Sequence, residues 1–138
     1  MTMREILFRG KHSPKSMWDY GDLYIDHDKV YISMRETMHG VRVHGEVIPE
    51  TVGQFTGLTD KNGTKIFEGD IVRAVLPKSN AIPEFVWPDM VVGFSEGAFS
   101  AMRGRYCTPL YSFAPAVELE VIGNIHEKPE LLEDEYHG

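Results

Sequence analysis

The segment GTKIFEGDIVRAV, residues 63–75, has the best-defined strand and turn pattern in this 138-residue chain. Its two apolar runs, KIF and IVRAV, are separated only by the Glu-Gly-Asp of residues 68–70. Gly69 can adopt backbone conformations closed to other residues, and the Asp70 carboxylate can accept backbone N–H bonds in a bend. The Asp-Lys-Asn-Gly of residues 60–63 tolerates the positive φ angles of a hairpin loop. The pattern predicts a three-strand meander. Its structural turn residues are Asn62, Gly63, Gly69 and Asp70.

Strand signals recur along the rest of the chain, because short apolar or alternating runs are bounded by turn residues. They lie at 4–10, 22–26, 29–34, 41–48, 54–59, 64–67, 71–76, 89–94, 98–104 and 117–125. Three prolines within 77–88 predict a surface excursion, and 106–115 reads as a second irregular stretch. Pro129 opens PELLEDEYH, which predicts a short C-terminal helix. We therefore expect a mainly β chain that forms one domain over residues 1–138.

Composition limits the compartment and the class of partner. The apolar share of 42% and the charged share of 25% are those of an ordinary globular protein. A net charge of -7 disfavours wholesale nucleic-acid binding through overall charge. Cys107 has no second cysteine to pair with, and the N-terminal residues lack the apolar core of a signal peptide, so we expect a cytoplasmic protein. No stretch approaches the roughly 20 apolar residues of a membrane-spanning helix.

Four segments together resemble the YopX-like family of phage and prophage proteins. They are MREILFRG at 3–10, PETVGQFTGLTDKNGTKIFEGDIV at 49–72, VVGFSEGAF at 91–99 and EVIGNIHEKPELL at 120–132. The resemblance implies a mostly β structure and a phage or prophage origin, and it supplies no catalytic residues. We expect any function particular to this chain in the segments without a matching motif, 11–21, 77–90 and 102–116.

The EGDIV turn also resembles the corner that opens a strand in many SH3-like barrels. This second resemblance implies an SH3-like, partly open and bent β-barrel with inserted loops, to which the pattern at 129–137 adds the short C-terminal helix. A fold of this kind does not by itself imply a function.

Candidate catalytic and metal-binding residues each have a simpler structural explanation. Glu68 and Asp70 lie two apart and can share a metal or a proton, but turn stabilisation accounts for both. His39 and His44 have the odd spacing that places strand side chains on opposite faces, which makes a poor chelate.

Two further candidates are equally weak. Asp-His-Asp at 26–28 suits a solvated turn between strands, and Cys107 has no partner motif for nucleophilic chemistry. The sequence predicts no enzyme activity, no bound metal and no cofactor. An enzyme with an unrecognised site is an open alternative.

Binding residues are predicted where large aromatic side chains fall in loops. The candidates are Trp87, Arg103, Arg105, Tyr106 and Tyr111. We interpret the chain as a non-catalytic protein-binding module with a host or phage protein as partner. The mixture of arginine and aromatic residues in 99–111 makes single-stranded nucleic acid the alternative partner. Exposed strand edges and the apolar residues of the proline-rich excursion also predict a homo-oligomer. These apolar residues are Ile82, Phe85, Val86 and Trp87.

Overall fold

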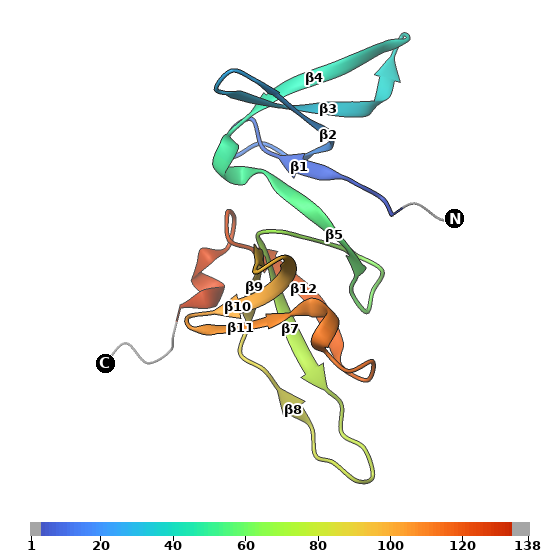
Figure 1. Cartoon of the computed structure of the whole chain (residues 1–138), viewed down its shortest axis with the longest axis vertical. Coiled ribbons are helices and arrows are strands. Elements are labelled where there is room, and N and C mark those ends of the chain that lie inside the picture. Colours follow the sequence, from blue (N-terminus) through green and yellow to red (C-terminus); the bar gives the residue numbers. More distant parts are fainter. Residues whose placement is uncertain (1–3, 134–138) are drawn as a thin grey trace. The chain divides into compact units, whose positions relative to one another are not determined.

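The computed structural model describes residues 4–133, apart from the side chains of residues 36–38. The chain divides after Gly57 into two compact units (Figure 1). It forms two antiparallel sheets, one of them a strongly curled half-barrel, and the helical segments of the described residues are 3-10 turns of three or four residues. The prediction of a mainly β fold is confirmed. A single domain over residues 1–138 stays a prediction.

The first unit is built from antiparallel strands in the order β4-β3-β2-β1-β5. The strands are β1 (Phe8–Gly10), β2 (Asp19–Asp26), β3 (Lys29–Met38), β4 (Val41–Val47) and β5 (Gly53–Thr59), with the 3-10 turn η1 (Pro49–Thr51) before β5. The predicted hairpin around 26–28 is confirmed, since β2 and β3 pair through Asp26 and Lys29. His27 has a φ of 56° in the turn.

Close approach of the backbone explains a glycine inside β2. A Cβ on Gly21 would clash with the Ser33 carbonyl oxygen of β3, so only glycine lets these strands pack as they do. Ile32 lies beside this contact and is fully buried. Two backbone hydrogen bonds of Lys11 hold the segment after β1 against the turn before β5. The Lys11 N–H donates to Thr51 Oγ1 at 2.9 Å, and the Lys11 carbonyl accepts from the Ile48 N–H at 2.7 Å.

The second unit holds a sheet in the order β11-β10-β9-β7-β12, with β8 added to β7. Its strands are β6 (Lys65–Phe67), β7 (Asp70–Leu76), β8 (Phe85–Val86), β9 (Met90–Ser95), β10 (Ala98–Arg103), β11 (Tyr106–Pro109) and β12 (Glu118–Asn124), and β6 pairs with β5. Its core consists of Ile66, Val72, Ala74, Met90, Val92, Ala101 and Leu110. Between β9 and β10 the chain reverses through Glu96 and Gly97, both at positive φ, as in a two-residue hairpin.

The loop at 60–63 is organised by one buried carboxylate. Asp60 Oδ1 accepts the backbone N–H groups of Asn62 and Thr64, and its Oδ2 accepts that of Val121 on β12, all at 2.9 Å. Gly63 has a φ of 82°. Burial raises the pKa of Asp60, but the three N–H donors outweigh it and hold the pKa below its ordinary value.

The corner at 68–70 is also stabilised by an aspartate that accepts a backbone N–H. Gly69 has a φ of 91°, and Asp70 Oδ2 accepts the Phe67 backbone N–H at 2.8 Å. The Gly69 N–H donates to the Val92 carbonyl and the Gly69 carbonyl accepts from Ile125 N–H. The corner therefore ties β6 and β7 to β9 and to the end of β12.

Three expectations differ from the structure. The strand expected at 4–10 is limited to β1, residues 8–10. Residues 106–109, expected to be irregular, form β11, because Pro109 ends an edge strand where a missing N–H is tolerated. The 3-10 turn η2 (Leu110–Ser112) follows. The C-terminal helix is the single 3-10 turn η3 (Pro129–Leu132), which ends because Glu133 is extended. The remainder of that predicted helix lies outside the described residues.

Within the described part of the chain, no helix has the length and apolar character needed to cross a membrane.

Candidate binding site

An apolar hollow of about 340 Å³ lies in the second unit, and we call it the Trp87 hollow. Its lining residues come from β8, the segment after it, β9, β10 and β11: Phe85, Trp87, Pro88, Met90, Arg103 and Tyr106. Met90 is fully buried, whereas Phe85 and Tyr106 are about half exposed. The hollow thus combines a buried apolar side chain with accessible aromatic ones.

The position of Trp87 follows from strand pairing and ring packing. Val86 pairs with Val75, and the backbone N–H of Trp87 donates to the backbone carbonyl of Ala74 at 3.0 Å. The indole packs edge-on against Phe85, with ring centroids 4.7 Å apart, and against Phe113 at 5.5 Å. Two aromatic rings and one backbone hydrogen bond therefore position Trp87.

Arg103 and Tyr106 also line the hollow. These residues are cross-strand partners at the end of the β10–β11 hairpin. Arg103 Nη1 donates to the Asp89 carbonyl oxygen at 2.8 Å, which fixes the guanidinium beside the hollow. The Asp89 carboxylate in turn lies 3.4 Å from Arg73 Nε. One fixed cation therefore borders an otherwise apolar and aromatic lining.

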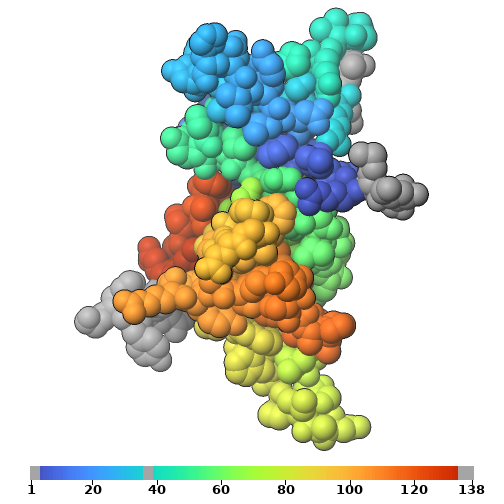
Figure 2. Space-filling model, in the orientation of Figure 1, coloured from blue at the N-terminus to red at the C-terminus, as the bar shows by residue number. Residues whose placement is uncertain are grey.

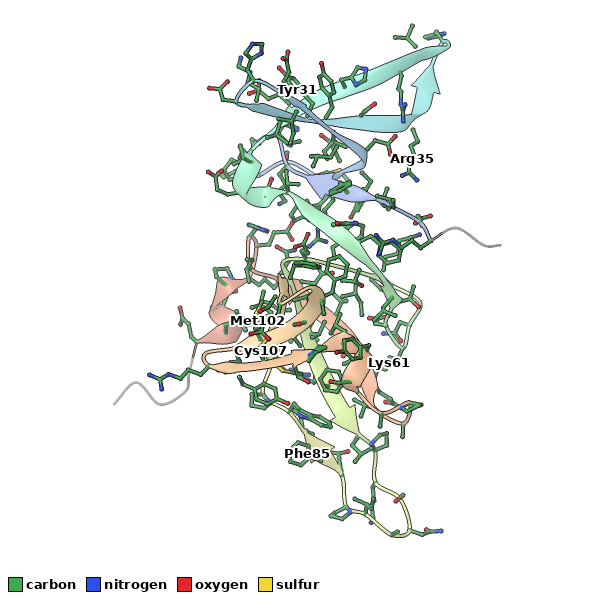
Figure 3. All side chains as sticks on the ribbon, in the orientation of Figure 1. Tyr31, Arg35, Lys61, Phe85, Met102 and Cys107 are labelled. Atoms are coloured by element: carbon green, nitrogen blue, oxygen red, sulfur yellow. The ribbon has the colours of Figure 1, made fainter. Side chains whose placement is uncertain are left out.

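Figure 3 labels Phe85, the first residue of β8, and Figure 2 shows the yellow-green segment around residue 80 projecting from the rest of the second unit. Ile82 and Val86 of this segment are also about half exposed. The projecting segment thus carries exposed apolar side chains beyond those that line the hollow.

Three of the five binding residues predicted from the sequence line the Trp87 hollow. They are Trp87, Arg103 and Tyr106. Arg105 and Tyr111 do not line it, although both side chains are exposed. Sequence reasoning assigned Phe85 to self-association and gave Pro88 and Met90 no role. For Phe85 and Pro88, the sequence signal was the density of apolar residues in the proline-rich excursion.

The candidates for catalysis and metal binding show no such convergence. Asp70 is buried in its corner, and His39 lies in the β3–β4 turn with a φ of 53°. His44 lies on β4 opposite Ser33. Among residues 4–133, side chains of 36–38 apart, no group of three or more His, Cys, Asp or Glu could hold a metal ion.

A second hollow, of about 520 Å³, lies in the first unit and was missed by sequence reasoning. It is lined by Leu7, Trp18, Asp19, Tyr20, Met34, Arg35 and Val43. Its sequence signal is the alternation of large side chains in WDYGDLY, residues 18–24, which places Trp18, Tyr20, Asp22 and Tyr24 on one face of a strand.

The model of the YopX protein family matches residues 7–133. The chain belongs to the YopX family. A solved structure with a similar fold is the crystal structure of protein EF1440 from Enterococcus faecalis, at 25% sequence identity and a TM-score of 0.54. The match covers 95% of this YopX chain and 100% of EF1440. No curated protein matches the chain. The comparisons extend the family and the fold over nearly all of the chain and name no activity.

Proposed function

We propose that this YopX-family chain is a non-catalytic protein-binding module whose Trp87 hollow receives an apolar side chain of a host or phage protein. The observation that carries the proposal is the convergence of Trp87, Phe85 and Tyr106 around one hollow. Aromatic and arginine residues dominate the energetics of protein interfaces, particularly where they surround a pocket that a partner can fill. The half-exposed rings of Phe85 and Tyr106 would be covered by such a partner.

Charge supports a protein over a nucleic acid at this hollow. Residues 58–138 contain seven Lys and Arg but thirteen Asp and Glu. Such an acidic unit repels phosphates at long range. Among the residues that line the hollow, one is cationic, Arg103. A single fixed cation suits one carboxylate of a protein partner better than a run of phosphates.

The fold context is part of the same proposal. We infer an SH3-like, partly open barrel for the strands that follow the 68–70 corner, because β7, β9 and β10 form an antiparallel meander and β12 pairs with the other side of β7. The loops of such a small barrel present recognition residues on a rigid framework. A phage or prophage origin, implied by the family resemblance, makes phage and host proteins the candidate partners.

The proposal is tested by capture experiments with three baits. Wild type is compared with Tyr106→Ala, which removes one wall of the hollow, and with Tyr111→Ala as the matched control. Both tyrosines are exposed, at 49% and 79%, so truncation should leave the fold intact. We expect one and the same protein with wild type and Tyr111→Ala, and its loss with Tyr106→Ala. Equal recovery by all three baits would refute binding through the Trp87 hollow.

A further inference from the structure

The outer face of β2 carries aromatic side chains interrupted by one acid. Trp18, just before the strand, and Tyr20, Asp22 and Tyr24 within it follow the period of two that places strand side chains on one face. Tyr20 and Tyr24 are both about half exposed. We call this surface, together with its neighbours on β3 and β4, the β2 face.

Tyr24 is the centre of an aromatic group on this face. Its ring centroid lies 5.8 Å from that of Tyr31 on β3 and 6.2 Å from that of His44 on β4. Tyr31 is labelled on this part of the first unit in Figure 3. At a rise of about 3.3 Å per residue, Tyr20 and Tyr24 stand about 13 Å apart along β2. The face therefore offers two separate aromatic platforms.

Two arginines lie between the platforms. Arg35 Nε and Nη2 donate to Asp22 Oδ1 at 3.2 and 2.9 Å, and Arg42 Nη2 donates to Asp22 Oδ2. The Arg35 and Arg42 guanidiniums hold the pKa of Asp22 below its ordinary value. Two guanidiniums share one carboxylate, so the cluster has an excess positive charge. Backbone carbonyls of Ile6 and Met34 also accept from these arginines and fix their positions.

Further positive charge lies beside Trp18. The Arg9 guanidinium carbon is 4.2 Å and the Lys11 Nζ is 5.0 Å from its ring centroid. Both cations are buried. Trp18, Tyr20 and Arg35 also line the first-unit hollow, which is large enough for a small planar ligand. Aromatic surface and fixed cations therefore coincide at this end of β2.

We propose that the β2 face binds single-stranded nucleic acid, with bases stacking on the platforms around Tyr20 and Tyr24 and phosphates contacting Arg35 and Arg42. Stacking platforms interspersed with cations are the means by which proteins bind single strands without sequence preference. The first unit is nearly neutral, since residues 1–57 contain seven Lys and Arg against eight Asp and Glu. It therefore lacks the strong acidic charge that would repel phosphates. Asp26 at the β2–β3 turn and Glu46, which pairs with Tyr31, lie away from the arginines. Asp19 lines the first-unit hollow together with Arg35. A protein ligand is the competing occupant of the face.

This inference is independent of the Trp87 hollow and is tested with purified full-length chain. The probe is a fluorescent single-stranded DNA of about 12 nucleotides, within the site sizes of small barrels, followed by anisotropy over a range of salt concentrations. We expect affinity to fall with salt, and single strands to bind more tightly than the matching duplex or a mononucleotide.

Two variants, each with a control, test whether nucleic acid binds at the β2 face. Tyr24→Ala should raise Kd about tenfold through the lost stack, with Tyr111→Ala unchanged. Arg42→Ala should reduce the salt slope by about one, with Arg105→Ala unchanged. Tyr20→Ala provides a second stacking variant if Tyr24→Ala alters the circular dichroism spectrum.

Several results would overturn the inference. These are the absence of binding by wild type, a mononucleotide that binds as tightly as the oligonucleotide, and equal affinities for the wild type and both tyrosine variants. Capture of a protein that survives nuclease treatment but is lost with Tyr24→Ala would assign the face to a protein ligand instead.

Discussion

Asp70 and Phe67 close the corner between β6 and β7, because the Asp70 carboxylate accepts the Phe67 backbone N–H at 2.8 Å. Asp70 is only 2% exposed, so its removal leaves a buried donor without this acceptor. We expect Asp70→Ala to lower the free energy of unfolding by about 1–3 kcal/mol, measured by chemical denaturation. Asp70→Asn, which retains a carbonyl oxygen, should lose less. Equal stability of wild type and Asp70→Ala would contradict a structural role.

Asp60 predicts a dependence of stability on pH. Its folded pKa is lowered from the ordinary value of 3.8, so the carboxylate contributes stability that is fully present above about pH 4 and is lost as the pH falls through the folded pKa. We expect wild type to be more stable than Asp60→Asn at pH 7, and the difference to shrink below pH 4. Thermal unfolding at a series of pH values measures it. A difference that does not change with pH would show that the ionised form contributes nothing.

Two strand glycines give a matched pair of substitutions. A Cβ on Gly21 would meet the Ser33 backbone carbonyl, which cannot move without shifting β3. A Cβ on Gly93 would meet only the terminal methyl of Met102, a flexible side chain. We expect Gly21→Ala to destabilise by about 2 kcal/mol or more and Gly93→Ala by less. The reverse order in denaturation midpoints would contradict the packing of β3 on β2.

The projecting segment predicts self-association. Ile82, Phe85 and Val86 are about half exposed, and β8 pairs on one side with β7. Exposed strand edges with apolar side chains favour pairing between copies. Light scattering at rising protein concentration should show dimers for wild type and fewer for Phe85→Ser. A strictly monomeric wild type at high concentration would remove this expectation.

The sequence predicted the hairpins well because their signals are local. Asn62-Gly63 and Gly69-Asp70 specify reversals within a few residues, and the strands around them follow. β11 was missed because Pro109 argues against a strand, although an edge position tolerates it. The C-terminal helix was overestimated because acidic residues and Pro129 describe a helix start without specifying its length.

The candidate site was harder to predict, since it depends on pairing between distant segments. Trp87 meets Tyr106 only because β8 adds to β7 and β10 pairs with β11. Tyr111 has the same loop signal as Tyr106 but does not line the hollow. In the first unit, the alternation from Trp18 to Tyr24 was visible in the sequence, but the arginines beside it come from β3 and β4 and require the sheet.

Binding of a protein at the Trp87 hollow is measured by affinity capture from infected or lysogenic cells, with and without nuclease, in which wild type is compared with Tyr106→Ala and Tyr111→Ala. We expect one protein that wild type and Tyr111→Ala retain after nuclease treatment and that Tyr106→Ala loses. Nucleic acid recovered together with that protein would be consistent with binding at the β2 face. Recovery of nucleic acid alone, or of a protein that Tyr106→Ala retains equally, would refute protein binding at the hollow.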